Sequence, residues 1–168
     1  MADHPLIAPR GLDDLFLYRL TRLMAVAGAP VIRLCEGRHG ITRREWRLIV
    51  ALAMEGPRLS SELADRVHLD RGRTSKTVSL LAAKGLVTRQ VRPHDRRQVE
   101  VALTPAGDAI YRSLFPEVAD LNRSLLSVLE GEDLARLDEL LHRLQAQAEA
   151  RLSQADLPKA DRRRRGRA

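Results

Sequence analysis

The spacing of apolar residues changes twice along this chain, and these changes limit its fold more than any other feature. From residue 12 to residue 83, apolar side chains recur at three- and four-residue steps, the spacing of amphipathic helices. Between Val87 and Leu103 they alternate with other residues, the spacing of strands. After Thr104 the helical spacing returns. The sequence therefore predicts a mainly α protein with one small β-hairpin.

Cap residues divide the first helical region into shorter helices. Thr42 and Glu45 have the spacing of a capping box, so a helix is expected to begin there. Ser60 and Asp70 are expected to cap two further helices, of which the second runs from Arg71 to Lys84. Two helices separated by a few residues form a helix-turn-helix. The hairpin that follows makes this arrangement a winged helix-turn-helix.

Further helices are expected on both sides of the winged domain, which we assign to residues 41–104. The first, residues 11–38, is expected to bend or break near Gly28 to Pro30, because proline lacks a backbone donor. The last region, residues 105–152, is expected to form two helices separated at Gly131. Their leucine-rich faces exceed what one small domain can cover, so both regions are expected to form the interface of a homodimer.

The chain is strongly basic, with a formal net charge of +7 in 168 residues and a pI near 10.6. Such a charge favours polyanionic partners, either nucleic acid or an anionic membrane surface. Aromatic residues make up only 3% of the chain, which argues against recognition of single strands by base stacking. Residues 158–168, which include four consecutive arginines from Arg162 to Arg165, are expected to form a disordered basic tail.

Other features argue against membrane, metal and enzymatic functions. No stretch approaches the roughly 18 apolar residues of a transmembrane helix, and the start of the chain lacks the order of a signal peptide. We therefore expect a cytoplasmic protein without a membrane partner. The five histidines are dispersed without metal-ligand spacing, so no metal or cofactor is expected. Nucleotide-binding and nucleophile-elbow motifs are absent from the sequence, which disfavours an enzyme.

Positive charge is concentrated in one part of the region expected to fold. From Arg71 to Arg97 there are eight lysines or arginines and one acidic residue, Asp95. A charged helix is usually only a solvated surface, but this cluster coincides with the helix and hairpin that would touch a DNA duplex. The side chains expected to contact DNA are Arg71, Arg73, Thr74, Ser75, Lys76, Ser79, Arg92, His94, Asp95, Arg96 and Arg97.

The dimensions of B-DNA assign a groove to each element. The helix fits the major groove, where an arginine can bind guanine through two hydrogen bonds. The hairpin tip would reach the neighbouring minor groove, whose negative potential attracts a guanidinium group. Asp95 would then hold Arg97 extended through a charge-assisted hydrogen bond. Alternatively, these two side chains only tie the turn together.

Four segments occur in a characteristic order along the chain. They are Leu59–Ala64, Leu81–Val87, Asp95–Arg97 and Leu103–Gly107. Together they resemble the MarR family of winged-helix transcription regulators, over roughly residues 12–144. The resemblance implies a homodimer that binds a pseudopalindromic operator and releases it when a small phenolic or aromatic acid binds. It also implies that Asp95 and Arg97 form the wing pair and that Ser75 and Lys76 face the groove. Arg73 replaces the small hydroxyl residue common in the family, which changes the expected base preference.

The region around residues 33–47 resembles a subgroup that controls the catabolism of aromatic compounds. A ligand carboxylate needs a cation and an aromatic or hydroxyl partner, so the candidate ligand-binding residues are Tyr18, His39, Arg43 and Trp46. Structural roles are the alternative: Trp46 would be a core residue, and Arg43 a surface residue beside a helix cap.

Two classes of function remain open. The first is a sequence-specific repressor released by a ligand, and the second is a constitutive architectural DNA-binding protein whose basic tail dominates affinity. A redox-sensing role for Cys35 is a variant of the second. The single cysteine cannot form an intrachain disulfide, and it lies near the end of the first helix, whereas related sensors carry their thiol near its start. A small buried side chain is the alternative explanation for Cys35.

Overall fold

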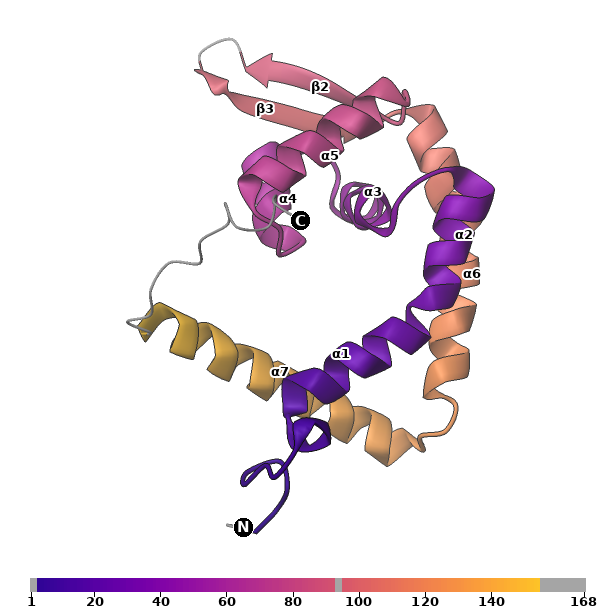
Figure 1. Ribbon diagram of the computed structural model, residues 1–168. Helices are drawn as coiled ribbons and strands as arrows, with labels where there is room; N and C mark the ends of the chain where they lie inside the picture. Colours follow the sequence, from indigo (N-terminus) through magenta and orange to yellow (C-terminus); the bar gives the residue numbers. More distant parts are fainter. Residues whose placement is uncertain (1–2, 93–94, 155–168) are drawn as a thin grey trace, which may run out of the picture. The chain divides into compact units, whose positions relative to one another are not determined.

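The computed structural model of this protein describes residues 3–92 and 95–154, and the side chains of residues 92, 95–97 and 153 are outside this description (Figure 1). The chain divides into two compact units, Met1–Leu125 and Leu126–Ala168. The predicted fold class, mainly helical with a small β-wing, is confirmed. The predicted basic tail, 158–168, lies outside the described residues. No helix in the described part of the chain is long and apolar enough to cross a membrane.

The N-terminal region forms two helices, α1 (Phe16–Ala27) and α2 (Ala29–His39), which are separated by the single residue Gly28. The predicted break is therefore confirmed. Pro30 lies in the first turn of α2, where the missing amide hydrogen has no helical partner to lose. A Cβ atom on Gly28 would lie 2.5 Å from a carbonyl oxygen of α1, so glycine permits this close junction.

Helix α3 (Arg43–Glu55) begins with the predicted capping box. The Thr42 amide donates to the Glu45 carboxylate at 2.6 Å, and the Glu45 amide donates to the Thr42 hydroxyl at 3.2 Å. The helix ends at Gly56, whose φ of 76° lies in the region that favours glycine. The predicted start of α3 is therefore confirmed.

Helices α4 (Ser60–Arg66) and α5 (Arg71–Ala83) form the predicted helix-turn-helix. The predicted cap at Ser60 is wrong, because Ser60 is already the first helical residue. The amide before it, that of Leu59, donates instead to the Glu62 carboxylate at 3.0 Å. Glu62, the third residue of α4, thus caps the amide of the residue that precedes the helix.

Three antiparallel strands form one sheet in the order β1-β3-β2. They are β1 (Arg58–Leu59), β2 (Val87–Arg92) and β3 (Asp95–Leu103). The predicted hairpin is confirmed: Val87 pairs with Leu103 at its base, and Arg92 pairs with Asp95 near its tip. Strand β1 was missed, because two residues are too short to show an alternating pattern.

Helix α6 (Pro105–Leu126) begins directly after Thr104, whose hydroxyl accepts the Gly107 amide at 3.1 Å. A Cβ atom on Gly107 would lie 2.1 Å from the Leu86 carbonyl oxygen. The first turn of α6 therefore lies against the backbone of Leu86, the residue before β2. This close contact is possible only because residue 107 is glycine.

The buried core lies in the winged-helix region, and one face of α5 packs against it. Its fully buried apolar side chains are Cys35, Ile41, Leu48, Ile49, Leu63, Val78, Leu81, Val101 and Leu114. They come from α2, α3, α4, α5, β3 and α6, and from the segment between α2 and α3. Because α5 is anchored in this core, its opposite face is presented to solvent.

Two helices carry apolar faces that remain exposed. In the second unit, α7 (Gly131–Gln154) has a stripe of leucines that are between 36% and 46% exposed. They are Leu134, Leu137, Leu140, Leu141 and Leu144. In α1, Leu17 and Val26 are almost three-quarters exposed. The break predicted at Gly131 occurs earlier, at residues 127–130, and Gly131 begins α7.

Candidate DNA-binding surface

Helix α5 has a buried face and a polar, exposed face. Asp70 caps the helix as predicted, because its carboxylate accepts the Arg73 amide at 2.9 Å. The Arg73 guanidinium lies 3.1 Å from the same carboxylate. The exposed residues among those predicted to contact DNA are Arg71, Arg73, Ser75, Lys76 and Ser79. All five lie on the surface, and their contact with DNA stays a prediction.

Thr74 is the exception among the predicted residues of α5. Its side chain is fully buried, and its hydroxyl donates to the Asp70 carbonyl at 3.1 Å. A hydroxyl that is buried and satisfied within its own helix cannot reach a base edge. The placement of Thr74 in the DNA-binding site was therefore wrong. Its neighbours Arg73 and Ser75 are exposed, because adjacent residues of a helix point in different directions.

A hollow of about 260 Å³ lies between the first residues of α4 and α5 and the strands β2 and β3. Its polar lining consists of Ser60, Ser61, Arg71, Ser75 and Arg89. Two guanidinium groups and three hydroxyl groups supply hydrogen-bond donors, a donor set that suits a phosphate of a nucleic-acid backbone. We call this site the serine–arginine hollow.

Arg89 connects the wing to α5, because its guanidinium donates to the Ser79 hydroxyl at 3.2 Å. Arg89 belongs to the basic cluster between Arg71 and Arg97, but neither it nor Ser60 and Ser61 was predicted to lie in the site. Alternation in β2 puts Arg89 on the same face as Val87. Nothing in the local sequence indicated that this face meets α5.

At the hairpin tip, the backbone brings Arg92 opposite Asp95, and Arg96 and Arg97 follow in β3. The side chains of these four residues lie outside the described part of the structure, and so does the whole of His94. The predicted contact between Asp95 and Arg97 therefore stays a prediction.

The four candidate ligand-binding residues come from three helices. Tyr18 in α1 and His39 at the end of α2 are half-buried, and Arg43 at the start of α3 is exposed. Trp46 is buried and stacks on Tyr111 of α6, with ring centroids 6.3 Å apart. A cavity of about 330 Å³ between α3 and α4 is lined in part by Trp46, but not by Tyr18, His39 or Arg43. Trp46 thus has the core role considered above and also borders a cavity.

A second cavity, of about 560 Å³, lies between α2 and α6, where the Arg38 guanidinium forms an ion pair with Glu117. No local sequence pattern predicted this cavity, because its walls are more than 70 residues apart in the chain. Cys35 of α2 is fully buried, and burial and the neighbouring Glu36 raise the pKa of its thiol. Among the described residues, no three potential metal ligands gather at one point.

Comparison with known proteins identifies the family. The model of the MarR family matches residues 39–98, which include α3, the helix-turn-helix and most of the wing. The regulator FarR of Neisseria gonorrhoeae is 31% identical over 104 residues, which cover 62% of this chain and 71% of FarR. This chain belongs to the MarR family.

Two further proteins are similar over more of the chain. The homoprotocatechuate degradative operon repressor of Escherichia coli is 28% identical over 130 residues, 77% of this chain and 83% of the repressor. The crystal structure of NadR in complex with 4-hydroxyphenylacetate is 27% identical, with a TM-score of 0.63, over 75% of this chain and 89% of NadR. FarR and the operon repressor are transcriptional regulators rather than enzymes, as expected for this MarR-family protein.

Proposed function

We propose that this MarR-family regulator is a sequence-specific DNA-binding repressor. The observation that carries the proposal is the exposed face of α5, whose Arg71 and Ser75 also line the serine–arginine hollow. A helix fits the major groove, where Arg71 and Arg73 would bind base edges. The hollow would hold a backbone phosphate and thereby fix the register of α5 on the duplex.

We propose that the protein acts as a homodimer on a pseudopalindromic operator. The leucine stripe of α7 supports this, because its five leucines occur at helical spacing and remain over one-third exposed. Burying such faces between two copies of the chain is the simplest way to remove them from water. Two copies of α5 would then read two related half-sites.

We propose an aromatic or phenolic acid as the effector that releases the operator. The relatives support this choice: one is named as the repressor of a homoprotocatechuate degradative operon, and NadR was crystallised with 4-hydroxyphenylacetate. Both names refer to hydroxylated phenylacetic acids. The candidates for effector contacts are Tyr18, His39, Arg43 and Trp46, and they enter this proposal as residues to be tested.

Selection of binding sites from random duplexes, followed by footprinting, tests the proposed function. The expected result is a protected site with two half-sites about 34 Å apart, one turn of the helix. The selected site should bind at least ~10³-fold more tightly than random duplex of the same length. Equal affinity for both duplexes would contradict the proposal.

A constitutive architectural DNA-binding protein is the second candidate, and the net charge of +7 favours it. Such a protein binds through phosphates alone, so its affinity should depend steeply on salt but not on sequence. Redox control through Cys35 receives no support, because a fully buried thiol with a raised pKa is both inaccessible and poorly ionised.

A further inference from the structure

The first turn of α5 holds an ion pair between two residues that are three positions apart in the sequence. The Arg73 Nε atom lies 3.1 Å from one carboxylate oxygen of Asp70. The other carboxylate oxygen accepts the main-chain amide of Arg73 at 2.9 Å. One carboxylate therefore contacts both the backbone and the side chain of Arg73, so the guanidinium lies beside the beginning of α5.

The ion pair uses the inner edge of the guanidinium. An arginine carries one N–H on Nε and four more on its two terminal nitrogens. Among the described residues, the Asp70 carboxylate is the one partner of the Arg73 guanidinium. The Arg73 side chain is 53% exposed, whereas that of Asp70 is 26% exposed. The carboxylate is thus partly shielded from water, while the outer edge of the guanidinium remains accessible.

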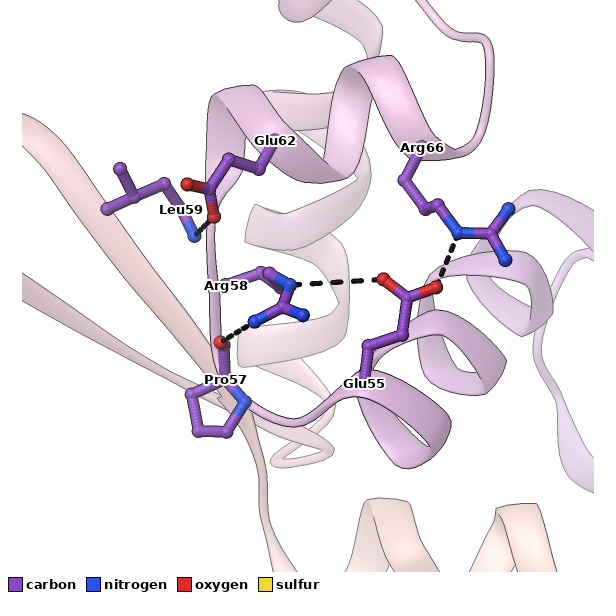
Figure 2. A network of polar contacts seen from close by, with 6 residues as sticks. All are labelled: Glu55, Pro57, Arg58, Leu59, Glu62 and Arg66. Carbon is purple, nitrogen blue, oxygen red and sulfur yellow. Dashed lines mark hydrogen bonds and ion pairs between the residues drawn. The ribbon is translucent and has the colours of Figure 1, made fainter.

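The helix and the turn that precede Asp70 are themselves held by α3. Glu55 at the end of α3 forms an ion pair with Arg66 of α4 (Figure 2). The Arg47 guanidinium donates to the carbonyl oxygen of Val67, in the turn between α4 and α5. These contacts matter for recognition, because a side chain reads a base precisely only when the backbone that carries it is fixed.

Gly72 lies on the exposed face of α5, almost opposite the buried Thr74. A Cβ atom on Gly72 would meet the Asp70 carboxylate at 3.4 Å, which is an ordinary contact distance. The fold therefore does not require glycine here, although alanine is the more favourable residue in a helix. The missing side chain instead lets another molecule approach the backbone of α5 closely beside Arg73.

We propose that Asp70 is a positioning residue, which fixes Arg73 so that its two terminal nitrogens donate to O6 and N7 of one guanine in the major groove. This role rests on the proposed function and names the base that α5 reads. Of the four bases, only guanine presents two adjacent acceptors in the major groove. An arginine that is already held in place loses less conformational freedom when it binds.

The negative charge of Asp70 makes its role measurable. A carboxylate beside the duplex repels the phosphates, so Asp70 lowers the affinity for DNA of any sequence. Its benefit appears only at the guanine that Arg73 reads. Removing the carboxylate should therefore raise the affinity for random duplex and lower the preference for the operator. A residue that only capped α5 would leave this preference unchanged when another capping residue replaced it.

Binding of the full-length chain to single-base variants of the selected operator tests the positioning role. Asp70→Ser and Asp70→Asn both keep a capping side chain, so their melting temperatures should stay close to wild type. Each should lower the preference for guanine at one position per half-site about 2- to 5-fold, the range of an exposed ion pair. Asp65→Asn, which removes an exposed carboxylate from α4, is the matched control and should leave this preference unchanged. Unchanged guanine preference in the Asp70 variants overturns the proposal.

A double-mutant cycle determines whether Asp70 acts through Arg73. Arg73→Ala should lower the guanine preference about 5- to 150-fold, the factor for a lost two-bond contact. In the Arg73→Ala background, Asp70→Ser should change the preference no further, because the side chain that Asp70 orients is gone. An equal effect of Asp70→Ser in both backgrounds overturns the link between the two residues.

A modified operator identifies the atom that is read. Replacing the guanine by 7-deazaguanine removes the N7 acceptor, and wild-type protein should then bind about 3- to 10-fold more weakly. The Arg73→Ala protein should bind both operators equally. Equal binding of both operators by wild-type protein overturns the contact with N7.

Gly72→Ala tests the close approach of the duplex. This variant should melt at or slightly above the wild-type temperature, because alanine favours the helix. It should nevertheless bind the operator more weakly, because the added methyl group occupies space beside the base pair. Undiminished operator binding by Gly72→Ala overturns the close approach.

The outcomes for wild-type protein separate this readout from the proposed function. Equal affinity of wild-type protein for every duplex contradicts the repressor function itself. A preferred operator in which no guanine depends on Arg73 overturns the readout but leaves the repressor function standing.

Discussion

Lys84 and Glu45, which lie 39 residues apart in the sequence, form an ion pair inside the winged domain. The Lys84 ammonium nitrogen lies 2.8 Å from one carboxylate oxygen of Glu45 and 2.9 Å from the other. It also donates to the Gly40 carbonyl at 2.8 Å. Glu45 is only 1% exposed. This pair joins the end of α5 to the junction between α2 and α3, so it fixes the far end of the helix proposed to enter the groove.

Removal of the lysine should destabilise the protein. Lys84→Met leaves the Glu45 carboxylate buried with only its Thr42 partner, and breaking a buried pair in this way costs about 3 to 5 kcal/mol. We expect the lower end of that range, because Lys84 itself is partly exposed. Urea unfolding measures the change. Lys76→Met, on the exposed face of α5, is the matched control and should change the unfolding free energy by less than about 0.5 kcal/mol.

Stability should also fall in acid. Burial alone would raise the pKa of Glu45, but the hydrogen bonds from Lys84 and Thr42 outweigh it, and the pKa lies below the ordinary value of 4.5. The unfolded chain then takes up a proton at a pH where the folded protein does not, so the contribution of Glu45 is present above pH 4.5 and is lost as the pH falls through the folded pKa. Unfolding free energies measured across this range should fall less steeply for Glu45→Gln. An identical slope would contradict the assignment.

The sequence was informative where structure depends on neighbouring residues. The capping box at Thr42 and the cap at Asp70 act over three residues, and each was predicted correctly. Thr74 was misplaced because its character as a hydroxyl residue said nothing about which side of α5 meets the core. The partnership of Lys84 with Glu45, and that of Arg47 with Val67, depend on how helices pack. No local pattern reports such packing, so the cavities and their polar partners were missed.

The close approach at Gly107 should not tolerate a methyl group. Gly107→Ala would place its Cβ atom 2.1 Å from the Leu86 carbonyl oxygen, and backbone atoms on both sides would have to move. We expect a loss of about 1 to 3 kcal/mol and a lower melting temperature by calorimetry. Gly131→Ala, where the added atom meets nothing within 4 Å, should melt close to wild type or slightly above it.

Base readout and phosphate contact should separate in a comparison of Arg73 with Arg89, whereas Arg71, which also lines the serine–arginine hollow, should contribute to both. Arg71→Ala and Arg73→Ala should each reduce discrimination at one base pair per half-site by about 1 to 3 kcal/mol. Arg89→Ala should weaken binding to all sequences equally and lower the salt slope by up to ~0.9 per lost phosphate contact. Fluorescence anisotropy with single-base operator variants at several salt concentrations measures both effects. The control is Arg112→Ala on α6, which removes an exposed arginine paired with Asp108. If Arg71→Ala and Arg73→Ala bound all operator variants with wild-type preference, the groove assignment of α5 would be wrong.

The leucine stripe of α7 should determine the oligomeric state. Leu141→Lys places a charge in the middle of this stripe, where a partner chain would have to bury it, and a buried unpaired charge is strongly unfavourable. Sedimentation should show a dimer for wild type and a monomer for the variant. Ala146→Lys adds the same charge on the opposite side of α7 and should remain dimeric. The monomer should retain salt-dependent binding to random duplex but lose the preference for paired half-sites, because each chain still carries one α5. A wild-type monomer, or a Leu141→Lys dimer with full operator preference, would exclude this interface.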